Sequence, residues 1–183
     1  LPKFKSTNPK MLMVDSIKGV KKIAMAEHHH DGEKSGHEKH KEHEALDPHV
    51  WLDPILVKIQ AKNILDAMCT LYPLHVKAFE ENYNAFINSI DTLDGTIKET
   101  LKEVKNRSFI VFHPSFGYFA ARYNLEQIPV EVSGKEVKPS ELASIIKEAK
   151  EEGAKVVFVS PQFSQKSAQI IAKEIGGKIL TID

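Results

Sequence analysis

Residues 27–54 read EHHHDGEKSGHEKHKEHEALDPHVWLDP, and the rest of the chain is organised around this stretch. Six of the nine histidines lie in its first part, within sixteen residues: His28, His29, His30, His37, His40 and His43. Residues 27–44 carry no apolar side chain, so they cannot bury enough surface to offset the entropy lost on ordering. Because imidazole is a common metal ligand, this composition predicts a flexible tether that binds metal; a solvated loop is the alternative interpretation.

The second part of the stretch, DPHVWLDP at residues 47–54, has the opposite character. Pro48 and Pro54 restrict the backbone on either side of His49, and Trp51 supplies a large apolar side chain two residues beyond it. We therefore expect the His49 imidazole to be held in one direction, as a metal ligand must be, with Trp51 as its anchor. A histidine with a purely structural role is the alternative.

Composition excludes several classes of partner. Lys plus Arg and Asp plus Glu both number 25, so the 183 residues lack the positive charge that favours nucleic acid or an anionic membrane. The longest apolar runs are far shorter than the roughly 20 residues that cross a bilayer, and no signal peptide is visible. Because the chain opens on Leu1 and closes on a strand-like run, we expect a fragment truncated at both ends. The single cysteine, Cys69, can make neither a disulfide framework nor a cysteine zinc site, and we expect it to be buried.

The first half of the chain predicts short strands followed by helices. Two apolar runs, residues 10–15 and 22–25, have strand length and are expected to pair or pack in a first domain. Asp53 and Pro54 are typical of a helix start, which predicts a helix from there to about residue 71. The residues expected on its buried face are Ile55, Ile59, Leu65 and Met68.

Residues 73–105 place apolar side chains at steps of three and four, the period of one long amphipathic helix. At about 1.5 Å per residue, about 30 residues span roughly 45 Å, which predicts a bridge between two domains. Two packed helices broken near Asp94 and Gly95 are the alternative, although one glycine costs a helix only about 1 kcal/mol.

Beyond residue 106 the chain alternates between strands and helices. The predicted strands are residues 109–112, 127–132, 155–159 and 178–182, and the predicted helices are residues 115–123, 140–152 and 164–175. Buried parallel strands separated by helices define an α/β layer domain.

Two side chains with metal-ligand chemistry follow predicted strands: His113 and Asp183. Because open α/β sheets bind ligands at the carboxyl ends of their strands, these two and His49 form a candidate set of three ligands. His75 lies away from any polar cluster, and we expect it on the surface. The sequence lacks GxGxxG after a strand, GxxxxGK[ST], HExxH and GxSxG, so dinucleotide, phosphate-loop, zinc-protease and serine-hydrolase interpretations have no support.

Several motifs together resemble one family. DPHVWLDP, YPLHVKAFEENYNAFI, FIVFHPSFGYFAARYNLEQIPVE, GKEVKPSELASIIKEAKEEGAKVVFVSPQFS and GGKILTID are similar to the metal-binding solute-binding proteins of ABC importers called cluster A-I or cluster 9, in their zinc-binding, ZnuA-like branch. The resemblance implies two parallel-sheet α/β lobes joined by a long rigid helix. The corresponding boundaries are residues 1–72 for the first lobe, 73–105 for the linking helix and 106–183 for the second lobe.

The resemblance also implies a site and a role. His49 matches a histidine ligand from the first lobe, His113 the ligand that opens the second lobe, and Asp183 an acidic residue at or near the site, whereas a further upstream histidine has no counterpart. Manganese-binding members tend to carry glutamate where His113 stands, which agrees with imidazole suiting Zn²⁺ and carboxylate suiting Mn²⁺.

The expected protein is a non-enzymatic, monomeric zinc-capture protein. It would lie in the periplasm or be anchored outside the cell, and would deliver Zn²⁺ to an ABC transporter permease. Manganese or iron capture, a zinc metallohydrolase and a metal-storage module that uses only the tether are the alternatives.

Deleting residues 27–43 from the full-length protein is expected to remove weak zinc equivalents and to leave the tightest site nearly intact, because His49 lies beyond the deletion. The tether would have to become ordered on binding, so its affinity is expected to be lower than that of a preformed site. Calorimetric zinc titration of the two proteins measures both effects. Equal stoichiometry would show that the tether binds no zinc, and loss of the tightest event would place the principal site elsewhere.

Overall fold

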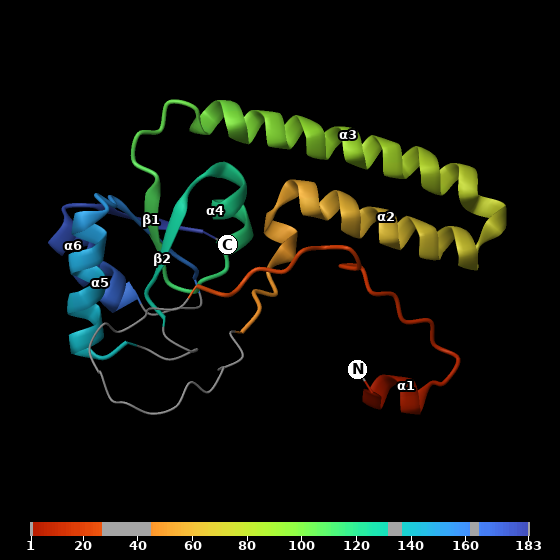
Figure 1. The fold of residues 1–183 in the computed structure, drawn as a ribbon, viewed down its shortest axis with the longest axis horizontal. Coiled ribbons are helices and arrows are strands. Elements are labelled where there is room, and N and C mark those ends of the chain that lie inside the picture. Colours follow the sequence, from red (N-terminus) through yellow and green to blue (C-terminus); the bar gives the residue numbers. More distant parts are fainter. Residues whose placement is uncertain (1, 27–44, 132–136, 162–164, 183) are drawn as a thin grey trace. The chain divides into compact units, whose positions relative to one another are not determined.

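The computed structural model describes residues 2–26, 45–131, 137–161 and 165–182 (Figure 1). Contacts divide the chain into two compact units, one formed by Leu1–Lys21 with Pro54–Thr96 and the other by Lys22–Asp53 with Ile97–Asp183. His49 groups with the second unit in this division. The lobe boundaries at residues 72 and 105, and the place of His49 in the first lobe, stay predictions for the complete protein.

The first unit is built from helices. The short α1 (Pro2–Thr7) is followed after a long connection by α2 (Pro54–Leu71), then by the 3₁₀ turn η2 (Pro73–His75) and the first part of α3 (Val76–Leu101). The predicted start and end of α2 are confirmed. Within the described residues this unit contains no strand, so the parallel sheet expected in the first lobe stays a prediction.

Helix α3 is one continuous helix of 26 residues that runs through Gly95, so the alternative of two broken helices is wrong. A Cβ at Gly95 would meet nothing within 4 Å, which shows that this glycine serves no close packing contact. The helix is about 39 Å long by its rise per residue. It begins in the first unit and its last residues belong to the second. The linking role expected for residues 73–105 stays a prediction for the complete protein.

The apolar faces of α2 and α3 share a groove within the first unit. Its lining includes Leu65 and Met68 from α2 and Phe79 and Phe86 from α3. The four residues predicted for the buried face of α2 are half-buried, as is Cys69, which was expected to be fully buried.

The strand expected at residues 10–15 is wrong. These residues form no strand, and Leu12, Met13 and Val14 are each about half exposed. An apolar run becomes a strand only where a partner accepts its backbone hydrogen bonds, which sequence periodicity does not report. The second expected strand, at residues 22–25, contributes a single antiparallel bridge between Ala24 and Leu46.

The second unit contains a four-stranded parallel sheet with the order β2-β1-β3-β4. Its strands are β1 (Ser108–Val111), β2 (Glu126–Pro129), β3 (Val156–Val159) and β4 (Lys178–Thr181). The helices between them are α4 (Gly117–Tyr123), α5 (Pro139–Glu151) and α6 (Gln165–Ile175). Every strand and helix predicted beyond residue 106 is therefore confirmed, with ends that differ by at most three residues.

Helices α5 and α6 cover one face of this sheet, and α4 lies on the other (Figure 1). Because side chains alternate along a strand, Ile110, Val157 and Val159 point to the α5 and α6 side, where they form the core with Ile145 and Ile171. Helix α5 begins at Pro139, where the Glu141 carboxylate accepts a hydrogen bond of 2.6 Å from the Lys138 N–H.

The strand order reverses in the middle of the sheet. The chain leaves β1 for β2 on one side, and it leaves β3 for β4 on the other, although β1 and β3 are neighbours. Crevices that bind ligands form at such a switch point, at the carboxyl ends of the strands. The loop after β1, which carries His113, starts at this point. Among the described residues, no helix is long and apolar enough to cross a membrane.

Replacing Ile171 with alanine is expected to lower the free energy of unfolding of the second unit by about 2–5 kcal/mol, because its fully buried side chain would leave a cavity between α6 and the sheet. Its neighbour Ile170 lies on the same helix but is 49% exposed, so Ile170→Ala is the matched control, with an expected loss under about 1 kcal/mol. Urea unfolding followed by the fluorescence of Trp51, which lies in the same unit, measures both. Equal losses would contradict the packing described for α6.

Candidate metal centre

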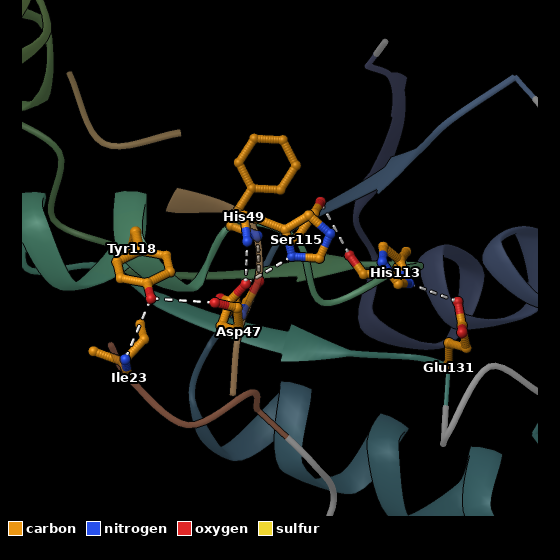
Figure 2. A network of polar contacts seen from close by, with 9 residues as sticks. Ile23, Asp47, His49, His113, Ser115, Tyr118 and Glu131 are labelled. Atoms are coloured by element: carbon orange, nitrogen blue, oxygen red, sulfur yellow. Dashed lines mark hydrogen bonds and ion pairs between the residues drawn. The ribbon is translucent and has the colours of Figure 1, made fainter. Parts of the chain in front are cut away.

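Two histidines that are 64 residues apart in the sequence lie side by side in the second unit (Figure 2). His49 directly precedes the 3₁₀ turn η1 (Val50–Leu52), and His113 lies two residues beyond β1. The centres of the two imidazole rings are 5.2 Å apart, and the ring planes make an angle of 79°. The structure therefore brings together the two predicted ligands that it describes.

The spacing of the rings fits a shared zinc ion. A Zn–N bond of about 2.0–2.1 Å puts the centre of an imidazole about 3.2 Å from the metal. Two such rings at a tetrahedral angle have centres about 5 Å apart. The observed 5.2 Å agrees with this value.

The Asp47 carboxylate fixes the imidazole of His49. Its Oδ1 atom accepts a hydrogen bond of 2.8 Å from the His49 backbone N–H and one of 2.7 Å from the ring atom Nδ1 (Figure 2). An ionised carboxylate can only accept, so the proton of the neutral ring lies on Nδ1. An imidazole held in this way coordinates a metal through its other nitrogen, Nε2.

His113 has the same arrangement. Its Nδ1 atom lies 3.0 Å from Oε2 of Glu131, which follows β2 (Figure 2). Because β1 and β2 are neighbours, the loops after them lie together, and the Glu131 N–H donates to the Phe112 carbonyl at 2.9 Å. Glu131 is thereby placed opposite His113 by the register of the sheet.

Helix α4 braces the segment around His49 on both sides. Before it, the hydroxyl of the buried Tyr118 donates to the Asp47 carbonyl at 3.2 Å. After it, the Arg122 guanidinium binds the Asp53 carboxylate, with Nε 3.0 and 2.9 Å from the two oxygens and Nη2 2.8 Å from Oδ2. His49 therefore sits between two contacts with one helix.

The expectation that Trp51 anchors this segment is wrong. Trp51 is 57% exposed, and its ring makes a T-shaped contact with the His49 imidazole, with centres 5.4 Å apart. The buried anchor is Val50, which is 1% exposed. In the tight turn η1 successive side chains point in different directions, so only one of the two neighbours can face the α4 side.

The ends of the histidine-rich segment are held together at its base. Met25 donates a hydrogen bond to the Ala45 carbonyl at 2.8 Å, and Asp47 donates to the Ile23 carbonyl at 3.0 Å. The Ile23 N–H in turn donates to the Tyr118 hydroxyl at 3.3 Å. The base of this segment and the carboxylate that holds His49 are thus parts of one hydrogen-bonded network.

The other predicted site residues are not all described. Asp183 and the six tether histidines, His28, His29, His30, His37, His40 and His43, lie outside the described residues. His75 is exposed beside Phe79, as predicted. Over the described ranges, no three His, Cys, Asp or Glu side chains gather as a complete metal site, so the two imidazoles are at most two ligands of a candidate site.

Sequence reasoning missed Asp47 and Glu131. Asp47 could have been found, because an acid two residues before a candidate ligand is close enough to bond its ring. Glu131 could have been found only by recognising that the strand before it is the neighbour of β1.

Comparison with known proteins agrees with the fold. The family profile described as "ZnuA: Zinc-uptake complex component A periplasmic" matches residues 2–183. The chain is 35% identical over 136 residues to the high-affinity zinc uptake system protein ZnuA of Bacillus subtilis, covering 73% of this chain. It is 34% identical over 159 residues to the zinc-binding protein AdcA of Streptococcus pyogenes serotype M3, covering 83% of this chain.

Solved structures of ZnuA are also similar to this chain. A crystal structure of ZnuA superposes on the whole chain with a TM-score of 0.85 at 38% identity. A ZnuA deletion mutant with zinc bound gives 0.83 at 37% identity. The fold is therefore that of the α/β, two-lobed solute-binding proteins. Within that class, the chain belongs to the ZnuA family.

The chain is shorter than these relatives. It spans 43% of the length of the Bacillus protein, 31% of the Streptococcus protein and 65% of the ZnuA chain in the crystal.

Replacing Arg122 with methionine is expected to lower the free energy of unfolding by about 2–3 kcal/mol, because a carboxylate that is only 5% exposed loses its guanidinium partner. Lys58→Met is the control, since the Lys58–Asp91 ion pair is exposed and contributes under about 1 kcal/mol. Urea unfolding followed by circular dichroism compares the two. Similar losses would show that the Asp53 contact does not brace the segment.

Proposed function

We propose that the complete protein captures Zn²⁺ outside the cytoplasm and delivers it to the membrane permease of an ABC importer. The observation that carries this proposal is the pair of adjacent imidazoles, His49 and His113, each held through Nδ1 by a carboxylate. Membership in the ZnuA family supports it, as do the zinc-binding names of the relatives.

In this proposal His49, His113 and Asp183 are ligands of the transported ion. Asp183 follows β4, whose carboxyl end lies on the same edge of the sheet as that of β1, because all four strands are parallel. A further ligand would come from a part of the protein that precedes this chain. Two neutral imidazoles favour zinc, whereas a manganese site would be richer in carboxylate and other oxygen ligands.

The chemistry required is binding and release. The protein would hold the two imidazoles ready, so little ordering entropy opposes capture. The histidine-rich segment would supply additional, weaker sites. The proposed location is the periplasm or the outer surface of the cell membrane, and the proposed state is a monomer.

His49→Ala and His113→Ala are each expected to weaken zinc binding by more than about 100-fold, because each removes a ligand and loss of a ligand exceeds the 10–100-fold effect typical of an outer-shell partner. His75→Ala is the matched control, since His75 is exposed in the turn η2, and it should bind zinc like the wild type. Chelator competition on the full-length protein measures the three affinities. Zinc should also raise the melting temperature of the wild type through binding linkage.

Unchanged affinity in both ligand variants would overturn the site. Tighter binding of Mn²⁺ than of Zn²⁺ in the same competition would favour the manganese importer instead. Metal-dependent turnover of ester, phosphoester or peptide substrates that His113→Ala abolishes would favour a metallohydrolase.

A further inference from the structure

We propose that Asp47 and Glu131 are positioning residues of the metal centre, which hold the two imidazoles in the tautomer that directs both Nε2 atoms to one ion. The inference rests on the proposed function and extends it to residues that do not touch the metal. It follows from the two Nδ1 contacts, 2.7 Å to Asp47 and 3.0 Å to Glu131.

Asp47 is a buried carboxylate whose described ion-pair contact is with the imidazole of His49. Its side chain has no solvent exposure, and its one described ion-pair partner is the His49 ring. The second oxygen, Oδ2, is buried and makes no hydrogen bond within the described residues. A cation held by Nε2 of His49 would polarise the ring and strengthen its hydrogen bond to the Asp47 carboxylate, so this contact would favour the metal-bound state.

The surrounding backbone is shaped to admit this carboxylate. A Cβ atom at Gly117, the first residue of α4, would lie 2.5 Å from Asp47 Oδ2. Only glycine leaves room for the carboxylate at this point. The close approach lets α4 donate the Tyr118 hydroxyl to the Asp47 carbonyl at the same time.

Glu131 performs the same task from a more open position. Its side chain is 10% exposed, and that of His113 is 34% exposed, compared with 0% and 13% for Asp47 and His49. Water screens the Glu131 contact more strongly, so its effect on the metal is smaller. The structure therefore predicts an order of importance, with Asp47 above Glu131.

The first measurement concerns the tautomer in metal-free, full-length protein. Long-range ¹H–¹⁵N correlation spectra at about pH 8, where imidazole is neutral, distinguish a protonated Nδ1 from a protonated Nε2. We expect Nδ1–H for both histidines in the wild type. Asp47→Ala should move His49 toward Nε2–H, and Glu131→Ala should do the same for His113, each without affecting the other ring.

The second measurement is zinc affinity by chelator competition. Asp47→Asn keeps an acceptor oxygen and removes the charge, so it should weaken binding about 10-fold, whereas Asp47→Ala should approach about 100-fold. Glu131→Gln should have a smaller effect than Asp47→Asn. Asp91→Asn, an exposed aspartate on α3, is the matched control and should leave affinity unchanged.

The outcomes separate this inference from the proposed function. Wild-type affinity in Asp47→Asn and Glu131→Gln, with both rings still Nδ1–H in the alanine variants, would overturn it. If the wild type binds no zinc at the centre but the tautomers respond as described, the proposed function fails and the positioning contacts remain. If Asp47→Ala does not fold, Glu131→Ala decides the matter by the same two measurements, because the Glu131 side chain has His113 as its described partner.

Discussion

The candidate metal centre depends on the buried carboxylate of Asp47. One of its oxygens accepts both the backbone N–H and the ring Nδ1 of His49, and its own backbone joins Ile23 and Tyr118. One residue thus ties the base of the histidine-rich segment, helix α4 and the imidazole together. A displacement of any of them would move the ring, because these hydrogen bonds form one connected network through Asp47.

The position of the centre in the fold explains why it can be rigid. His113 stands where the strand order of the sheet reverses, and His49 stands in a segment that Arg122 and Tyr118 clamp onto α4. Both imidazoles are therefore positioned by helices or strands of the second unit. His113 follows strand β1, whereas the segment of His49 is held by helix α4. If these imidazoles are the ligands, as proposed, they would need little reorganisation when an ion binds.

Much of the second unit could be predicted because its signals are local. Apolar runs of strand length and the residues that begin and end helices are recognised within a few positions of the chain. They predicted the strands and helices described beyond residue 106. The contact between His113 and Glu131 could not be predicted, because it joins residues 18 apart and depends on β1 and β2 being neighbours. The prediction that Trp51 is the buried anchor was wrong for a related reason. Its size suggests burial, but Val50 occupies the side of the turn that faces α4.

Two hydrogen-bonded pairs at the base of the histidine-rich segment allow the length of this segment to change without moving His49. The hydrogen bonds between Met25 and Ala45 and between Ile23 and Asp47 set the register of the chain before His49, whatever number of residues lies between them. Closing a longer connection costs little, about 0.6 kcal/mol for each doubling of its length. Residues can therefore be added, removed or replaced between these pairs without moving His49, and a reporter domain could be inserted there for the same reason.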